Sequence, residues 1–107
     1  MARKTTKFEA SDYLDSPEVI AAYITEALET GDSAFIAMAI GDVAKAKGMT
    51  SVASETGLTR ESLYKSFNGT SMPEFETVRS VLDSLGMKLV VEPKLREATS
   101  LHTVFTE

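Results

Sequence analysis

The sequence predicts an all-α domain of five helices, followed by one short β-strand. The helices are predicted because apolar residues recur at intervals of three and four, in runs bounded by capping residues and glycines. The strand is predicted from the alternation in MKLVVE, residues 87–92. A chain of 107 residues suffices for a single domain with its own core. We therefore expect an N-terminal arm over 1–15, the helical domain over 16–92 and a flexible C-terminal tail over 93–107.

The first two helices are predicted from their ends as much as from their apolar faces. Residues 16–18, Ser-Pro-Glu, begin the first helix with a capping hydroxyl, a proline at the first helical position and a carboxylate at the positive end of the helix dipole. The apolar stripe of this helix ends near Gly31. Asp32 or Ser33 then caps the second helix, and Gly48 ends it.

Two very short helices follow, separated by a glycine. Thr50 is expected to cap a helix over 51–56, Gly57 to form the turn, and Thr59 to cap a helix over 60–67. Such a turn requires glycine because its backbone adopts positive φ. The residues expected to face inward are small or apolar: Val52, Ala53, Leu58, Leu63 and Phe67. The last short helix is left with a polar outer face.

The final helix begins at Pro73, ends at Gly86 and buries an apolar row of Phe75, Val78, Leu82 and Leu85. The strand over 87–91 ends before Pro93. It is expected to pair with residues 5–8 or with a second copy of itself, and it is our first candidate for a homodimer interface.

Composition excludes several classes of protein. The chain has no cysteine, which rules out disulfides and thiolate chemistry. Its longest apolar stretch is FIAMAI, 35–40, far short of the about 20 residues of a membrane span. The charged N-terminus lacks the apolar region of a secretion signal. We expect a cytoplasmic protein without a membrane partner.

Charge is unevenly distributed along a chain of net charge −5. Residues 8–43 carry eight acidic and no basic residues, whereas residues 44–70 carry four basic and two acidic ones. The basic stretch contains the two short helices. Either the acidic segment attracts a basic partner, or it is a solvated surface.

The short helices fit a DNA-binding helix-turn-helix, in which the N-terminal part of the second helix enters the major groove. Arg60 is able to bind guanine through two hydrogen bonds and Glu61 to accept one from cytosine, while Tyr64 and Lys65 suit phosphates or base edges. The N–H groups at the start of the first short helix are able to bind a phosphate. The predicted DNA-binding residues are Thr50, Ser51, Thr59, Arg60, Glu61, Ser62, Tyr64, Lys65, Asn68 and Thr70.

An enzyme is disfavoured, and no cofactor or metal is expected. The single histidine, His102, lies in the predicted tail. Two pairs of carboxylates are closely spaced, Glu26 with Glu29 and Glu74 with Glu76. Helical surfaces commonly carry such pairs in solvent without a catalytic role. A phosphate-binding glycine loop and metal-spaced ligands are both missing from the sequence.

Three stretches resemble the HigA-like probable addiction module antidote antitoxins, a branch of the Cro/C1-type helix-turn-helix proteins: GDVAKAKGM (41–49), ETGLTRESLYKSF (55–67) and PEFETVRSVLDSLG (73–86). The resemblance implies an antitoxin that neutralises a small basic RelE/ParE-type toxin, binds double-stranded operator DNA and represses its own operon. It also implies DNA contacts at Thr50, Ser51, Thr59, Arg60, Glu61, Tyr64 and Lys65. We expect a homodimer, because helix-turn-helix proteins usually bind DNA as dimers.

The sequence departs from the family pattern at Ser51 and Ser54, where longer side chains that can touch DNA are common, and at Met72, where the family often has asparagine. Ser71 is the alternative cap for the final helix. Two other functions therefore stay open. One is a free-standing, prophage-type regulator without a toxin, and the other is an interaction module that has lost DNA binding.

Overall fold

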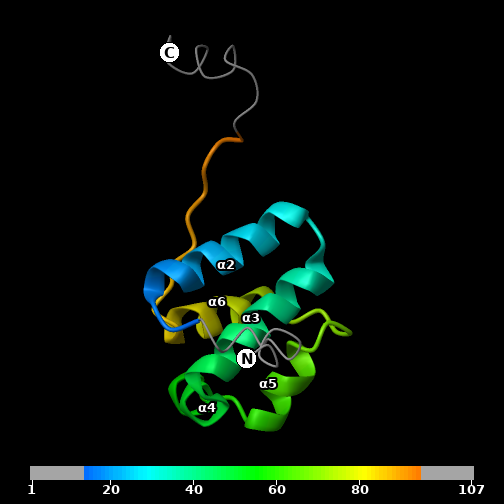
Figure 1. Cartoon of the computed structure of the whole chain (residues 1–107). Coiled ribbons are helices and arrows are strands. Elements are labelled where there is room, and N and C mark those ends of the chain that lie inside the picture. Colours follow the sequence, from blue (N-terminus) through cyan, green and yellow to red (C-terminus); the bar gives the residue numbers. More distant parts are fainter. Residues whose placement is uncertain (1–13, 95–107) are drawn as a thin grey trace, which may run out of the picture.

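Five helices occupy residues 14–94, the part of the chain that the computed structural model describes (Figure 1). They are α2 (Pro17–Thr30), α3 (Ser33–Lys47), α4 (Met49–Thr56), α5 (Arg60–Ser66) and α6 (Phe75–Ser84). The predicted all-α class is confirmed for these residues. Most of the predicted N-terminal arm and C-terminal tail, with the strand partner at 5–8, lies outside the described residues.

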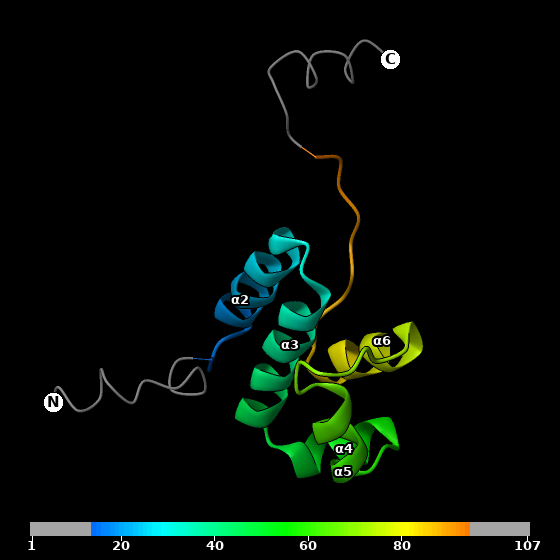
Figure 2. The same ribbon diagram turned by 90° about the vertical axis from the view of Figure 1, so that its right-hand side faces the viewer.

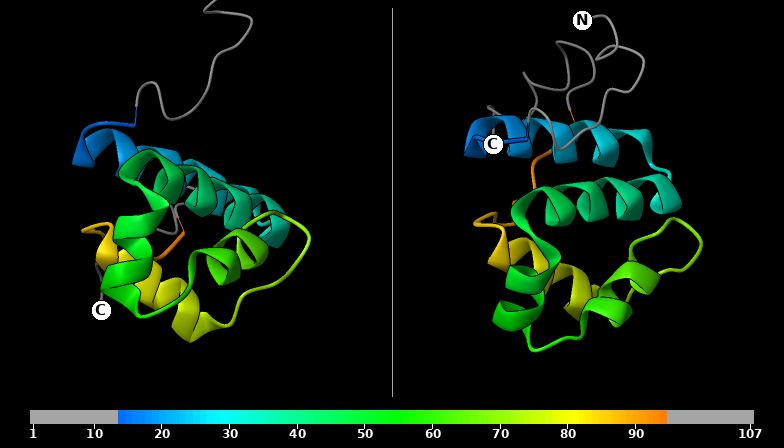
Figure 3. Two further views of the ribbon diagram at one scale, coloured as in Figure 1. Left: turned by 90° about the horizontal axis from the view of Figure 1, so that it is seen from below. Right: turned by 60° about the horizontal axis from the view of Figure 1, so that its bottom comes forward.

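The caps of α2 and α3 form as the sequence predicts. The Ser16 hydroxyl oxygen accepts a hydrogen bond from the Val19 N–H at 3.2 Å, and Gly31 ends α2 at a φ of 72°. Asp32, rather than Ser33, caps α3, because its carboxylate accepts from two N–H groups of the first turn at 3.1 and 3.2 Å. The two helices lie side by side and run in opposite directions (Figure 3).

The core is built around α3, which packs against α2, α4 and α5, while α6 packs against α4 (Figure 2). All the side chains in it are apolar, and no polar or charged residue among those described is buried. The buried cluster consists of Leu14, Ile24, Ala37, Ile40, Val43, Ala44, Met49, Val52, Leu63, Phe67, Val81, Leu82 and Leu85.

The start of α4 differs from the prediction that Thr50 caps a helix over 51–56. The helix begins at Met49, and its N-cap is Gly48, which makes no side-chain hydrogen bond. Gly48 adopts a φ of 118°, ends α3 and starts α4 without an intervening loop. Burial of Met49 draws the chain into the core at this point, so Thr50 becomes an exposed residue inside the first turn.

The start of α6 also differs from the prediction. The helix begins at Phe75 with Glu74 as its N-cap, so neither Pro73 nor Ser71 takes the expected part. The helix is buried through its second half, where Val81 and the following leucines join the core. Phe75 lies in the first turn and is 69% exposed, so its assignment to the core is wrong.

The predicted strand over 87–91 is not formed. The Met87 N–H donates to the Leu82 carbonyl at 2.9 Å and closes α6, after which residues 88–94 run on without regular secondary structure. No other described segment forms backbone hydrogen bonds with 88–94. A strand requires a second strand beside it, and none of the described residues supplies one.

Candidate nucleic-acid interface

The connection between α4 and α5 is held by hydrogen bonds from residues within it. Gly57, at a φ of 78°, donates its N–H to the Ala53 carbonyl at 2.9 Å and ends α4. The Thr56 hydroxyl donates to the Val52 carbonyl at 2.8 Å, and its oxygen accepts from the Leu58 N–H at 3.3 Å. The predicted glycine turn is confirmed, and it joins the two short helices.

Thr59 then begins α5 as predicted. Its hydroxyl oxygen accepts a hydrogen bond from the Ser62 N–H at 3.0 Å, which satisfies one of the free donors of the first turn. The inner face of α5 is anchored by Leu63, which is fully buried, and by Phe67, the C-cap, at 3% exposure. Because these anchors are four residues apart, they fix the rotation of the helix about its axis.

The packing of α3 against the end of α5 depends on Gly41. A Cβ atom added to Gly41 would lie 2.5 Å from the Phe67 carbonyl oxygen and 3.0 Å from the Phe67 Cβ. Glycine therefore allows the two backbones to approach each other. Its position in the middle of a helix is explained by this contact, since glycine costs about 1 kcal/mol relative to alanine there.

The outer face of α5 consists of polar and charged side chains. Glu61 and Lys65 lie opposite the buried Leu63, and Arg60 and Tyr64 are exposed beside them. Within residues 14–94 the one ion pair joins Lys47 and Glu55, so neither base of α5 is neutralised by a described carboxylate. These two positive charges are therefore open to an anionic partner.

A polar depression of about 410 Å³ runs beside this face. Four of the predicted DNA-binding residues meet there, Thr59, Glu61, Ser62 and Lys65. Ser71 and Ser66 complete it, and of these two Ser66 was not among the predicted site residues. Ser66 follows Ser62 by four residues, so helical spacing was a usable signal for it, whereas Ser71 is placed by the loop after α5.

The remaining predicted site residues come from α4 and from the loop. Thr50 is exposed and Ser51 half-buried, both in the first turn of α4, where no side chain caps the helix. In the loop, the Asn68 side-chain oxygen accepts from the Thr70 N–H at 2.9 Å and from the Thr70 hydroxyl at 2.7 Å. Asn68 and Thr70 therefore hold each other in a turn, and both are exposed.

The acidic helix lies away from this face. In Figure 1, α2 is at the top of the helical body and α4 and α5 are at the bottom, and Figure 2 agrees. The exposed carboxylates of α2 and of the residues just before it are Asp15, Glu18, Glu26 and Glu29. Lys47 adds no free positive charge beside the outer face of α5, because its amine donates to Glu55 at 3.3 Å and to the Ser84 carbonyl.

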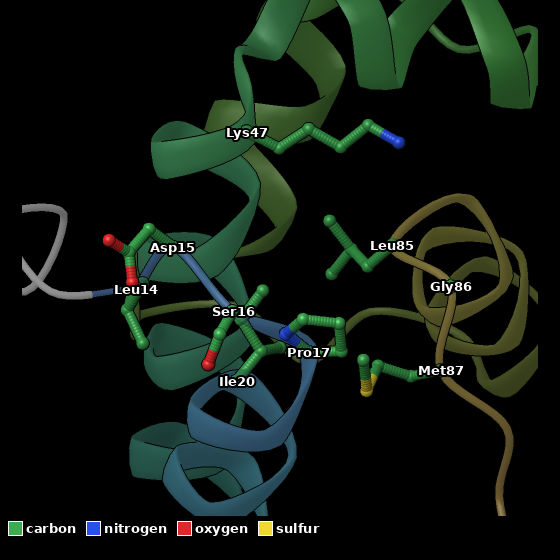
Figure 4. Close-up of a pocket in the computed structure, with 9 residues that line it drawn as sticks. All are labelled: Leu14, Asp15, Ser16, Pro17, Ile20, Lys47, Leu85, Gly86 and Met87. Carbon is green, nitrogen blue, oxygen red and sulfur yellow. The ribbon is translucent and has the colours of Figure 1, made fainter.

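A second, mainly apolar pocket of about 220 Å³ lies where the start of α2 meets the end of α6 (Figure 4). Ile20, Leu85 and Met87 line it, and the carboxylate of Asp15 and the amine of Lys47 point to opposite sides. The pocket therefore lacks an opposed acid and base. Among residues 14–94, no cluster of three His, Cys, Asp or Glu is placed to hold a metal ion, and no helix is long and apolar enough to cross a membrane.

The described residues define a small helical protein with an exposed polar face on α5. The chain belongs to the family described as probable addiction module antidote protein, whose family model matches residues 4–93. A protein of Haemophilus influenzae (strain ATCC 51907 / DSM 11121 / KW20 / Rd), described as uncharacterized, is 35% identical over 92 residues, which cover 86% of this chain and 95% of the relative. No solved structure matches the chain.

Family membership points to an antitoxin role with a toxin as partner, because the antidote of an addiction module counteracts a toxin. Such antidotes are in general not enzymes. The antidote family predicted from the sequence is confirmed, while the HigA-like and Cro/C1-type assignments stay predictions.

Proposed function

We propose that this protein is the DNA-binding antitoxin of a type II toxin–antitoxin module. It neutralises a small basic toxin of the RelE/ParE type and represses its own operon as a homodimer in the cytoplasm. The α4–turn–α5 unit is its helix-turn-helix of the Cro/C1 type, and α5 is the helix that enters the major groove. The protein carries out no reaction of its own and takes no cofactor.

The observation that carries the DNA-binding part is the division of α5 into two faces. Leu63 and Phe67 attach the helix to the core, while Arg60 and Lys65 project with no described carboxylate bound to them. A helix held this way presents its polar residues without rearrangement. Placement of the acidic α2 at the opposite end of the body supports the same proposal, because it keeps like charges away from the DNA phosphates.

Within this proposal the residues have separate tasks. Arg60 and Glu61 contact base edges, and Lys65 contacts phosphate. Thr59 and Ser62 contact bases or phosphates at the entrance to the groove. The uncapped first turn of α4, at Thr50 and Ser51, receives a phosphate. Asn68 and Thr70 contact the backbone from the loop.

The DNA-binding part is tested by fluorescence anisotropy with DNA from upstream of the gene and with scrambled DNA, at two salt concentrations. Arg60→Ala is expected to cost about 1–3 kcal/mol on the cognate site and to relax base preference. Lys65→Ala is expected to weaken binding to both DNAs alike. Arg79→Ala is the matched control, because it removes an exposed base from α6. Equal, sequence-independent losses for Arg60→Ala and Lys65→Ala would refute their assigned tasks.

The toxin-binding part is tested with the product of the neighbouring gene. A small basic protein encoded there is expected to co-purify with this chain and to be inhibited by it. The triple variant Glu18→Gln, Glu26→Gln, Glu29→Gln is expected to slow association at low salt more than at high salt, because it removes exposed carboxylates of α2. Selective DNA binding without any toxin partner would indicate a free-standing regulator. Toxin inhibition without selective DNA binding would indicate an interaction module.

A further inference from the structure

The segment that follows α6 exposes apolar side chains that the described fold does not cover. Leu89, Val90 and Val91 are 44%, 62% and 95% exposed. The backbone of residues 88–94 forms no hydrogen bonds with any other described residue. The segment leaves the helical body beside α2 (Figure 1). Unpaired backbone groups and consecutive exposed apolar residues are together the features of a strand edge that another chain covers.

The order of charges in this segment is symmetric about Val90. Lys88 stands two residues before Val90 and Glu92 two residues after it. We propose that two copies of this chain pair through residues 88–92 as an antiparallel two-stranded ribbon centred on Val90. Lys88 of each copy then lies opposite Glu92 of the other. Because a two-fold axis repeats every contact, the ribbon contains two such pairs of opposite charge, and each charge of both copies has a partner.

Neighbouring registers do not have this property. Pairing centred on Leu89 places Lys88 opposite Val90 and leaves both charges without an opposite partner. Pairing centred on Val91 places Lys88 opposite Lys94, and like charges directly opposite each other destabilise a ribbon. The charges therefore select the register centred on Val90.

The position of Pro93 agrees with this register. Hydrogen-bonded and non-hydrogen-bonded pairs alternate along an antiparallel ladder. If the two Val90 residues form a hydrogen-bonded pair, so do Lys88 and Glu92, while Met87 and Pro93 form a non-hydrogen-bonded pair. The backbone nitrogen of Pro93 then points away from the partner strand, where a missing N–H removes no bond.

A groove beside α2 provides the support that a two-stranded ribbon needs, because such ribbons are only marginally stable alone. A cavity of about 630 Å³ separates α2 from the segment, with Ile24 and Leu28 on one wall and Met87 and Leu89 on the other. In the proposed register, Val91 of the second copy lies opposite Leu89 and on the same face of the ribbon. Pairing therefore covers the most exposed of the three apolar residues next to an apolar groove.

A second copy is favoured over another protein because the charge symmetry is a property of this sequence paired with itself. The inference rests on the homodimer of the proposed function and names its interface. It requires neither DNA nor toxin, so its test uses the purified full-length chain alone. Sedimentation velocity over a concentration series gives the dimerisation constant. The chain is expected to dimerise, and a chain that stays monomeric throughout the series would overturn the proposal.

Charge reversal tests the partner and the register together. Lys88→Glu and Glu92→Lys are each expected to weaken dimerisation on the order of tenfold at low salt, because each converts two attractive pairs into two repulsive ones. The double variant restores opposite charges and is expected to recover the wild-type constant. Single variants without effect, or a double variant that fails to recover, would contradict the proposed register.

Proline substitution tests the hydrogen-bond pattern. Val90→Pro removes an N–H that points toward the partner strand and is expected to weaken dimerisation at least about tenfold. Val91→Pro is the matched control, since its N–H points away from the partner, and a change within about threefold is expected. Both residues are exposed, so far-UV circular dichroism should show the same helical content for both variants. Equal effects of the two prolines would refute the pattern.

Discussion

For Gly41→Ala, helix propensity predicts a gain in unfolding free energy, whereas the packing in the structure predicts a loss. Alanine in the middle of a helix is favoured over glycine by about 1 kcal/mol. At Gly41, however, the new methyl group would lie 2.5 Å from the Phe67 carbonyl oxygen, an atom of the backbone rather than of a flexible side chain. An inserted methyl group in a packed interior costs about 1–3 kcal/mol, and a backbone obstacle favours the upper part of that range.

The expected net effect of Gly41→Ala is a loss of about 1–2 kcal/mol of unfolding free energy, the difference between the packing cost and the propensity gain. For a domain of this size such a loss lowers Tm by about 4–8 °C per kcal/mol. Urea unfolding followed by far-UV circular dichroism measures the midpoint and the slope. We also expect weaker operator binding, because the obstructed contact is at the C-cap of α5.

Gly31→Ala is the control that separates steric overlap from backbone strain. A Cβ at Gly31 meets nothing within 4 Å, but the residue has a φ of 72°, so the substitution is expected to cost about 1–2 kcal/mol through strain alone. It should leave operator affinity unchanged, since it lies between α2 and α3. A Gly41→Ala protein as stable as the wild type, or more stable, would show that α3 and α5 do not approach as closely as described.

Three further predictions concern the site and the core. Thr59→Ala is expected to destabilise the protein by about 1 kcal/mol in urea unfolding, because it removes the cap of α5. Thr59→Ser keeps a capping hydroxyl and is expected to retain most of that stability. Leu63→Ala is expected to cost about 2–5 kcal/mol because the side chain is fully buried, and a smaller loss would place α5 outside the core. Phe75→Ala is expected to cost less than about 1 kcal/mol by the same assay, since 69% of the residue is exposed, and a core-sized loss would contradict that placement.

Features that depend on neighbours in the chain were predictable from the sequence. The caps at Ser16, Asp32 and Thr59 and the turn at Gly57 all form, because each needs only its own side chain or conformational freedom and N–H or carbonyl groups a few residues away. The polar outer face of α5 was predictable for the same reason, since helical spacing alone separates it from Leu63. DNA contact by that face stays a prediction.

Features that depend on distant residues were decided by the tertiary structure. The sequence contains no signal for the contact of Gly41 with Phe67, which lies on another helix. Burial of Met49 moved the start of α4 away from the expected threonine cap, and the packing of α6 through its second half left Phe75 exposed.

The sequence by itself determined the number and order of these helices and the polar outer face of α5, because hydrogen bonds within a turn and the helical period act over a few residues. Only the tertiary structure decided which glycine permits a close approach, which aromatic is exposed, and that residues 88–94 have no strand beside them among the described residues. Each of these depends on atoms that the chain brings together from far apart.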